Sequence, residues 1–169
     1  MLIFEKVSSR ITLVKLGSFS DHRGLFTKIQ LPEEYSDFNQ IYVTQNPHSR
    51  TLRGLHSQRA PFSERKIVLC LAGKIFDVAI SLEPKSNAER EVFQITIGPN
   101  EEYQGIVLPN DMAHGYITLE SNTTLLYFID QEYSSSHSLR LRWDDPSFGI
   151  DWPTGPQVIS DEDASAPYL

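Results

Sequence analysis

The sequence KIVLCLAGKIFDVAIS (residues 66–81) predicts two β-strands, Lys66–Leu71 and Ile75–Ser81, joined as a hairpin. Both strands are rich in β-branched and apolar residues, and Gly73 between them permits a tight turn. One face of the second strand is large and apolar, whereas the other carries the smaller and more polar Asp77 and Ala79. This alternation is typical of a barrel whose partly polar interior holds one ligand.

Short apolar runs bounded by turn residues continue on both sides of this stretch. The further expected strands are Ile11–Leu16, Leu25–Ile29, Gln40–Gln45, Val92–Ile97, Gln104–Leu108, Gly115–Leu119 and Thr123–Ile129. Helical periodicity is weak, so we expect no more than a turn or two at Pro32–Phe38 and at Asp161–Ala166. The pattern therefore predicts an all-β protein with few short helices.

Length and composition favour a single domain spanning residues 1–169. A chain of 169 residues, with 40% apolar and 22% charged residues, is long enough to bury one core and short for two. We expect the barrel to occupy about residues 10–130. The segment 143–169 is interrupted by prolines and contains two tryptophans, so we expect it to pack over the barrel.

Net charge and cysteine content exclude several classes of protein. The net charge of −7 disfavours binding to nucleic acid, which needs a basic face. No apolar stretch reaches the length of a membrane span, and the N-terminus lacks the pattern of a secretory signal. The lone cysteine, Cys70, stands in an apolar run and leaves no disulfide framework, which fits a reducing compartment. We therefore expect a cytoplasmic protein without membrane or nucleic-acid partners.

His56 and His114 show the strongest functional pattern among the five histidines. Each lies beside an expected strand end, and the nearby Gly54 and Gly115 permit close approach of another group to the backbone. A histidine in such a place is either a catalytic group or a hydrogen-bonded residue of the barrel wall. The other histidines lie in polar, turn-rich segments, where most histidines are solvated: His22, His48 and His137.

Metal binding is the obvious alternative role for histidines in a β-barrel. Metal-binding cupin barrels place two histidines one residue apart, then a carboxylate, and a further histidine on a later strand. Here Gln58 stands two residues after His56, and Glu64 comes late and beside two basic residues. Two imidazoles without an ordered carboxylate make a poor site for a divalent ion, so the sequence predicts no metal.

Basic residues gather around His56 in the sequence. Arginine makes bidentate contacts to phosphate, and lysine provides a compact charge for an oxyanion. The candidates are Arg23, Arg53, Arg59, Arg65 and Lys66. For Arg59 and Arg65 a surface position is the better interpretation. Arg53 lies three residues before His56, so it faces away from His56 unless Gly54 introduces a bulge.

Tyr127 lies in the middle of the expected strand Thr123–Ile129. A tyrosine in such a position is usually a core aromatic whose hydroxyl reaches the rim. If it instead faces the barrel interior opposite His56, the two side chains form an acid–base pair that acts on opposite faces of a ligand.

Nine short motifs follow one another in register along nearly the whole chain. They are DHRGLF (21–26), LRGLHSQ (52–58), KIV (66–68), GKIFDVA (73–79), AHG (113–115), LY (126–127), WDDP (143–146), GIDWP (149–153) and DASAP (163–167). In these motifs the chain resembles the dTDP-4-dehydrorhamnose 3,5-epimerases and related sugar-nucleotide epimerases. The resemblance implies a cupin-like jelly-roll barrel, a double-stranded β-helix, that forms a homodimer and needs neither a metal nor an organic cofactor.

The resemblance also implies an isomerase that inverts C3, C5 or both in a 4-keto nucleotide sugar through an enolate. The family's catalytic base matches His56, and the aspartate that orients this base matches Asp163. The acid on the opposite face of the sugar matches Tyr127, and the lysine beside the developing enolate matches Lys66. The positions expected to bind the substrate are Arg23, Lys28, Gln45, Asn46, Arg53 and His114.

Four positions depart from the family pattern, and all of them lie in the substrate-binding set. The family's residues there are glutamate, glutamine, glutamate and lysine, and this chain carries Lys28, Thr44, Ser138 and Glu162 in their places. The four catalytic matches are all kept. We therefore expect the same type of reaction on a sugar nucleotide other than dTDP-4-keto-6-deoxyglucose.

Three alternatives stay open at this point. The first is a ketoisomerase that moves the carbonyl group between C3 and C4 on the same barrel. The others are a metal-dependent cupin and a sugar-binding module without activity. The inverted carbon, the nucleotide (dTDP, GDP, CDP or UDP) and the pathway also stay open.

Overall fold

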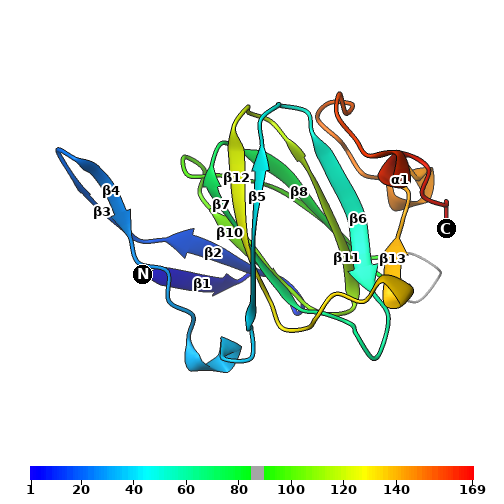
Figure 1. The fold of residues 1–169 in the computed structure, drawn as a ribbon, viewed down its shortest axis with the longest axis horizontal. Coiled ribbons are helices and arrows are strands. Elements are labelled where there is room, and N and C mark those ends of the chain that lie inside the picture. The colour runs from blue at the N-terminus through cyan, green and yellow to red at the C-terminus, as the bar shows by residue number, and fades with distance from the viewer. Residues whose placement is uncertain (85–89) are drawn as a thin grey trace.

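Two facing β-sheets form the body of the molecule, and Figure 1 labels their strands. The computed structural model describes residues 1–84 and 90–169. The first sheet consists, in spatial order, of β1 (Leu2–Lys6), β2 (Thr12–Leu16), β10 (Gly105–Leu108), β7 (Lys66–Ala72), β12 (Thr123–Ile129) and β5 (Gln40–Asn46). The second sheet consists of β13 (Ser138–Arg140), β6 (Leu52–Gln58), β11 (Met112–Thr118), β8 (Ile75–Ser81) and β9 (Val92–Ile97). The expected all-β architecture is confirmed.

Residues 1–84 and 90–169 contain four short helical segments. Three are 3-10 turns, at Glu33–Tyr35, Ser135–His137 and Pro146–Phe148, and one is the short helix α1 (Asp161–Ala164). The turns expected near 32–38 and 161–166 are thus confirmed. Within residues 1–84 and 90–169, no helix is long and apolar enough to cross a membrane.

The turn at Gly73 carries the chain from the first sheet to the second, so the expected hairpin is wrong. β7 pairs with β10 and β12, whereas β8 pairs with β11 and β9. Both strands bury one face between the sheets. They are consecutive in the chain but do not hydrogen-bond to each other, because the turn between them is a corner that leads from one sheet to the other. Gly73 adopts a φ of +75°, and a Cβ atom there would lie 2.8 Å from the Cα of Thr123. The corner therefore requires glycine.

All nine expected strands form: β8, β9 and β12 have the expected bounds, and the other six have shifted ends. In residues 1–84 and 90–169, four observed strands are not among those expected. The four are β1, β6, β13 and β3 (Ser18–Asp21), which pairs with β4 (Gly24–Thr27). In addition, β11 begins at Met112 instead of Gly115, so that His114 lies inside the strand and not beside its end. His56 likewise lies within β6, two residues before its last residue.

Apolar side chains from both sheets pack together between them. The central cluster combines residues of the first sheet with residues of the second: Leu13, Val68, Cys70, Ile106, Ile75, Ala79 and Tyr116. Cys70 is fully buried, and burial raises the pKa of its thiol to about 12. This cysteine is therefore a small packing residue, as its apolar surroundings in the sequence predict.

The outer face of the second sheet is covered by the C-terminal part of the chain. Leu55 and Ile80 of this sheet form a cluster with Leu141 and Phe148, and Trp152 packs against it. This segment also continues into α1, which contacts β6 and thereby approaches the strand that carries His56. The C-terminal residues thus lie against the barrel.

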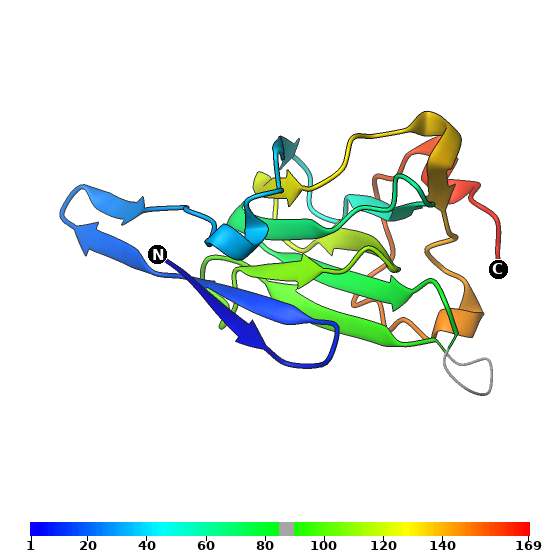
Figure 2. The same cartoon turned by 90° about the horizontal axis from the view of Figure 1, so that it is seen from below.

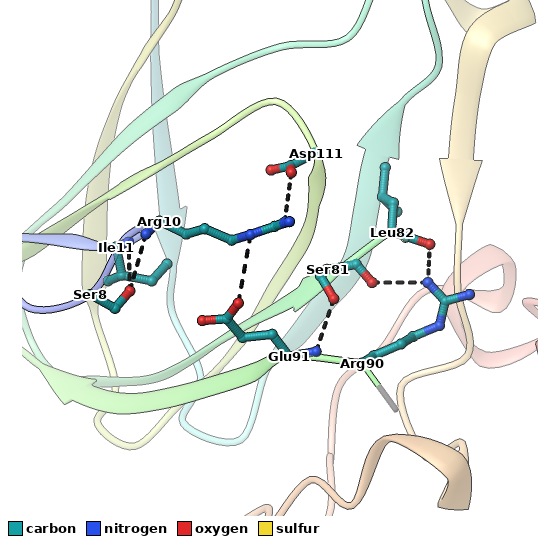
Figure 3. Close-up of polar contacts among 8 residues, drawn as sticks. All are labelled: Ser8, Arg10, Ile11, Ser81, Leu82, Arg90, Glu91 and Asp111. Carbon is teal, nitrogen blue, oxygen red and sulfur yellow. Dashed lines mark hydrogen bonds and ion pairs between the residues drawn. The ribbon is translucent and has the colours of Figure 1, made fainter. Parts of the chain in front are cut away.

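A cluster of charged residues joins the two sheets at one end of the sandwich, as Figure 3 shows. Arg10, just before β2, donates from Nη1 to Asp111 Oδ2 at 2.6 Å, and its Nε lies 3.6 Å from Glu91 Oε2. Asp111 directly precedes β11 and Glu91 directly precedes β9, so one arginine beside a strand of the first sheet contacts the residues that lead into two strands of the second. Next to this cluster, Arg90 donates to the carbonyl oxygen of Ser81 at 2.9 Å.

The β3–β4 hairpin projects away from the two sheets. Figure 1 and Figure 2, which view the molecule at right angles, both show the hairpin extending from one end of the body. Three large apolar side chains on it are exposed by about seven-tenths: Phe19, Leu25 and Phe26. A patch of this kind on a projecting arm is typical of a surface that another protein covers.

Candidate active site

Two adjoining cavities of about 510 and 300 Å³ are lined by residues from both sheets. They share His56 from β6 of the second sheet and Tyr42, Lys66 and Ile129 from the first sheet. The smaller cavity is also lined by Tyr127 of the first sheet. The chemically active residues predicted from the sequence thus face one space from two sides.

His56 and Asp163 form a hydrogen-bonded pair although 107 positions separate them in the chain. His56 Nε2 lies 2.6 Å from Asp163 Oδ1, and Asp163 Oδ2 accepts the backbone N–H of Gly54 at 3.2 Å. The carboxylate comes from α1, which Ser160 caps by accepting the Asp163 N–H at 3.1 Å. The side chain of His56 is 38% exposed and that of Asp163 only 6%, so the imidazole faces the cavity with the carboxylate behind it.

The surroundings of Asp163 keep its carboxyl group ionised. Burial by itself raises the pKa of Asp163, but the bonds from His56 and Gly54, together with the nearby Arg140, outweigh it and lower the pKa below the ordinary value. An ionised carboxylate fixes the tautomer of the imidazole and stabilises the imidazolium form. Because Asp163 binds Nε2, the Nδ1 atom of His56 is left to take up a proton from a ligand.

A β-bulge turns Arg53 and His56 toward the same cavity. In the pairing of β6 with β11, Gly54 and Leu55 together stand against the single residue Gly115. Gly54 adopts a φ of +125°, and a Cβ atom on it would lie 2.5 Å from the Cα of Gly115. The sequence could not decide whether Gly54 introduces a bulge, and the structure shows that it does. The close approach expected at these two glycines is confirmed.

Lys66 provides a buried cation in both cavities. Its Nζ lies 2.7 Å from Glu64 Oε1, and the other oxygen of Glu64 accepts a hydrogen bond from Gln58 Nε2 at 2.9 Å. Both members of the ion pair are about nine-tenths buried. The ammonium group is thus held in one place, where it can stabilise negative charge on a ligand oxygen.

Tyr127 faces the cavity from the first sheet, opposite His56 on the second. Burial, supported by the neighbouring Tyr116 and by the charge of Asp77, raises the pKa of Tyr127 well above its ordinary value. The phenol is therefore protonated at neutral pH and can donate a proton. Of the two interpretations of Tyr127, the structure favours the one in which the side chain faces the barrel interior.

His114 belongs to a second histidine–carboxylate pair. Its Nε2 lies 2.7 Å from Asp77 Oδ2, and both side chains are buried. His114 lines the smaller cavity together with His56 and lies opposite it on the adjacent strand β11. In residues 1–84 and 90–169, no group of three or more histidine, cysteine or acidic side chains that could hold a metal ion occurs.

Three of the six expected binding residues are close to the cavity. Arg53 Nε donates to Asn46 Oδ1 at 3.0 Å, and Arg53 lines the smaller cavity together with His114. Gln45 lies on the opposite face of β5 from Thr44, because successive residues of a strand alternate. It lines a separate surface cavity with Asn46 and does not reach His56.

The two remaining binding candidates, Arg23 and Lys28, lie on and just after the projecting hairpin. Arg23 Nη2 contacts Asp21 Oδ2 at 2.6 Å within the same hairpin, and its side chain is 80% exposed. Neither Arg23 nor Lys28 lines the cavities at His56. The structure does not bring these two residues to the active site of their own chain.

Several other cavity residues were not among the site residues expected from the sequence. They include Tyr42, Glu64, Tyr116, Tyr133 and Arg140. Tyr42 and Thr44 alternate along β5 and share its inner face, so strand periodicity contained a signal for them. Arg140 contained none, because β13 has only three residues and its position depends on pairing with β6.

Comparison with known proteins identifies the family. The family model described as dTDP-4-dehydrorhamnose 3,5-epimerase matches residues 9–169 of this chain. The chain belongs to the dTDP-4-dehydrorhamnose 3,5-epimerase family. The dTDP-4-dehydrorhamnose 3,5-epimerase of Sinorhizobium fredii is 30% identical over 176 residues, which cover 99% of this chain and 90% of the relative. The enzyme of the same name from Salmonella typhimurium is 28% identical, with 100% and 96% covered.

Solved structures of dTDP-4-dehydrorhamnose 3,5-epimerases share the fold. The one from Sulfolobus tokodaii has a TM-score of 0.83 at 29% identity, and the alignment covers 99% of this chain and 94% of the other. The one from Bacillus anthracis, solved with TDP and PPi bound, has a TM-score of 0.86 at 26% identity, with 99% and 100% covered. Membership in this family of epimerases confirms the expected cupin-like jelly roll and the expected isomerase class.

Proposed function

We propose that this member of the dTDP-4-dehydrorhamnose 3,5-epimerase family inverts C3, C5 or both in a 4-keto nucleotide sugar, with His56 as base and Tyr127 as acid. One observation carries these roles: the two side chains line one cavity from facing sheets. Inversion removes a proton from one face of a carbon and delivers another to the opposite face. Two proton-transfer groups on opposite sides of a sugar are what this reaction requires.

Proton removal is the difficult step. The 4-keto group acidifies the hydrogens on C3 and C5, yet they remain far less acidic than an imidazolium ion, so the enolate must be stabilised as it forms. The buried Lys66 ammonium, anchored by Glu64, supplies a fixed positive charge for the enolate oxygen. Such a group contributes about 3 kcal/mol to a transition state. His56 takes the proton, and Asp163 stabilises the resulting imidazolium.

Reprotonation completes the inversion. Tyr127 stands on the sheet opposite His56, and its raised pKa keeps the hydroxyl protonated until it is needed. It donates its proton to the face of the enolate that His56 does not reach. The Lys66 ammonium lies on β7, next to the Tyr127 strand, and compensates the developing phenolate.

The nucleotide part of the substrate is assigned to the remaining polar groups of the site. Arg53, held by Asn46, and the buried His114 are the groups suited to a diphosphate or its ribose. The replacements Thr44 and Ser138 lie at the cavities and leave smaller or neutral side chains there. We propose that the preferred sugar nucleotide differs from dTDP-4-keto-6-deoxyglucose.

A homodimer is the proposed functional unit. The exposed apolar residues Phe19, Leu25 and Phe26 lie on the projecting hairpin, and Ile41 and Val43 are exposed on the edge strand β5. A second copy of the chain that covers these surfaces would bury them from water. The hairpin of one copy would then carry Arg23 and Lys28 to the cavity of the other, which explains why they lie outside their own site.

The chain is proposed to act as a single cytoplasmic domain. Asp163 belongs to the C-terminal segment 143–169 and serves His56 of the barrel, so the proposed catalytic pair needs both parts. Cys70, buried and weakly acidic, is compatible with a reducing compartment.

The proposed reaction is tested by NMR of the products from 4-keto-6-deoxy sugars carried on dTDP, UDP, GDP and CDP. We expect one of them to retain its carbonyl at C4 while the configuration at C3 or C5 inverts. Relocation of the carbonyl to C3 would identify a ketoisomerase instead. If none of the four is converted, the proposed activity is wrong.

A thermal-shift series with the four nucleoside diphosphates identifies the base. A ligand that binds only the folded protein stabilises it by about 2.7 kcal/mol at one hundred times its dissociation constant. We expect one diphosphate to raise the melting temperature clearly more than the others. Efficient turnover of dTDP-4-keto-6-deoxyglucose would contradict the proposed difference in substrate and leave the reaction type intact.

A further inference from the structure

Arg140 places a cation against the carboxylate that His56 uses. Arg140 lies opposite His56 in the pairing of β13 with β6, and opposed residues of an antiparallel pair project to the same side. Its Nε lies 3.5 Å from Asp163 Oδ1, the same oxygen that lies 2.6 Å from His56 Nε2. In the described part of the chain this buried Nε has no hydrogen-bond partner, so charge alone governs the contact.

A second carboxylate shares the guanidinium group. Arg140 Nη2 lies 2.5 Å from Glu162 Oε2, and Glu162 is the residue directly before Asp163 in α1. Glu162 is 68% exposed and Arg140 37%, whereas Asp163 is 6% exposed. Arg140 therefore contacts two carboxylates at once, the solvated one of Glu162 and the buried one of Asp163.

We propose that Arg140 is a positioning residue for the His56–Asp163 pair and that Glu162 is its counter-ion. The guanidinium fixes Asp163 Oδ1 and opposes a second positive charge on His56, so the imidazole stays available as a base at lower pH. Glu162 weakens this effect by neutralising part of the arginine charge. The inference rests on the proposed role of His56 as the base.

Other ionisable groups also face His56, and they have partners of their own. Arg53 donates to Asn46, and Lys66 pairs with Glu64. His114 on the adjacent strand β11 pairs with Asp77. The phenols that share a cavity with His56 are Tyr42, Tyr116, Tyr127 and Tyr133. None of the hydrogen bonds and ion pairs named here involves Arg140, so a shift in the pH profile of an Arg140 variant reports the arginine.

The test compares the pH dependence of kcat/KM in the full-length protein and in Arg140→Met. Without the cation, the protonated form of His56 becomes more favourable, and the acid limb of the profile moves to higher pH. The expected displacement is about 0.5 to 1 pH unit for charges this close in a partly solvated site. Arg140→Lys keeps the charge and restores most of the wild-type profile, and in Arg140→Met kcat falls while KM is retained.

Two further variants separate this effect from a loss of structure. Glu162→Gln removes the exposed counter-ion, which leaves more of the arginine charge facing His56, so the acid limb moves to lower pH. Arg142→Met is the matched control, because Arg142 is the next arginine on this segment and contacts Asp144 at 2.7 Å instead of Asp163. We expect its profile to match the wild type.

NMR titration of the His56 ring in the same four variants gives a readout without any substrate. Its midpoint should move in the same direction as the acid limb in each variant. Overlapping titrations for wild type, Arg140→Met and Glu162→Gln would overturn the role of Arg140. If the titrations shift as expected while no 4-keto sugar nucleotide is turned over, the positioning role stands and the proposed function fails.

Discussion

At the scale of single residues, the site holds two acids in opposite states at the same pH. Asp163 is ionised because hydrogen bonds and a nearby arginine outweigh its burial, whereas Tyr127 is protonated because burial dominates. In the proposed reaction, His56 is the group that takes up a proton and so changes its charge. The proposed roles of these residues therefore depend on the surroundings of each side chain and not on its type alone.

Asp163→Asn tests the orienting carboxylate. An asparagine cannot stabilise an imidazolium ion, so we expect kcat/KM to fall by about 10² to 10⁴-fold. Because the folded protein lowers the pKa of Asp163, its ionised form stabilises the fold above the ordinary carboxyl pKa of about 3.9. That contribution is lost as the pH falls through the lowered pKa. Urea unfolding should show a larger difference between the two proteins at pH 7 than at pH 3, and an equal difference would contradict this account.

Tyr127→Phe separates proton removal from inversion. His56 can still take a proton from the sugar and return one from solvent to the same face, so we expect hydrogen exchange at the reacting carbon without inversion. Loss of one positioned acid should slow inversion by at least about 10²-fold. Tyr103→Phe is the control, because Tyr103 donates to Glu5 and lines neither cavity at His56. Unchanged inversion in Tyr127→Phe would assign the acid elsewhere.

The same phenol also makes stability depend on pH at the alkaline end. Its pKa is raised in the folded protein, so its contribution is complete below the ordinary value of about 10 and is lost as the pH rises toward the folded value. We expect the wild type to lose melting temperature faster than Tyr127→Phe between pH 9 and 11, as scanning calorimetry can measure. Parallel curves would mean that Tyr127 is not buried as described.

The proposed catalytic residues could be named from the sequence because each lies in its own motif and has one matching position in the family pattern. The surroundings of each of these residues could not be predicted from the sequence. Arg53 faces the cavity only through a bulge, which period-two reasoning cannot detect. Glu64 and Arg140 reach the site through contacts between segments, and nothing in their local sequence distinguishes them from surface charges.

At the scale of secondary-structure elements, the site depends on the close approach of β6 and β11. Gly54 and Gly115 face each other across the two strands, and neither has room for a side chain. The resulting bulge directs Arg53 and His56 into the same cavity. Because glycine and polar residues interrupt its alternation, β6 was not among the strands expected from the sequence, although it carries the proposed base.

Gly115→Ala is expected to damage this arrangement. The new Cβ atom would lie 2.7 Å from Leu55 Cδ2 and 2.8 Å from the Arg53 carbonyl oxygen, so the strands must separate. We expect a loss of about 2 kcal/mol in the free energy of unfolding and a loss of activity at temperatures where the protein stays folded. Gly155→Ala is the control, because a Cβ atom there meets nothing within 4 Å. Equal melting temperatures for the two variants would contradict the close approach.

The connections between elements explain what the strand pattern missed. Nine strands were expected at nearly their observed places, because alternation and turn residues are local properties. The corner at Gly73 could not be distinguished from a hairpin, since both need a glycine with positive φ between two strands. β13 and α1 are too short for any periodicity and are defined by their contacts with β6.

At the scale of the whole molecule, the projecting hairpin and the edge strand β5 expose large apolar side chains to solvent. Half or more of Ile41 and Val43 is exposed on that edge, and Phe26 is exposed on the hairpin. Edge strands with apolar side chains are usually covered. A second copy that covers both would also complete the substrate site with Arg23.

Val43→Arg tests this assembly. A charge buried without a partner at an interface costs several kcal/mol, so we expect the wild type to sediment as a dimer and the variant as a monomer at micromolar concentration. Activity should fall together with dimer content, because each cavity would lack the partner's hairpin. Val7→Arg, in the turn between β1 and β2, is a control at another exposed valine and should stay dimeric. A wild type that sediments as a fully active monomer would contradict the proposed dimer.

Solvent exchange tests the central claim, that His56 removes the proton, more directly than any other measurement. The wild type and His56→Asn are incubated in D2O with the nucleotide sugar that the wild type converts, and deuterium at C3 and C5 is followed by NMR. We predict that the wild type incorporates deuterium at each carbon it inverts and that His56→Asn, folded and still binding the nucleotide, shows neither exchange nor inversion. Exchange at the wild-type rate in His56→Asn would show that another group is the base.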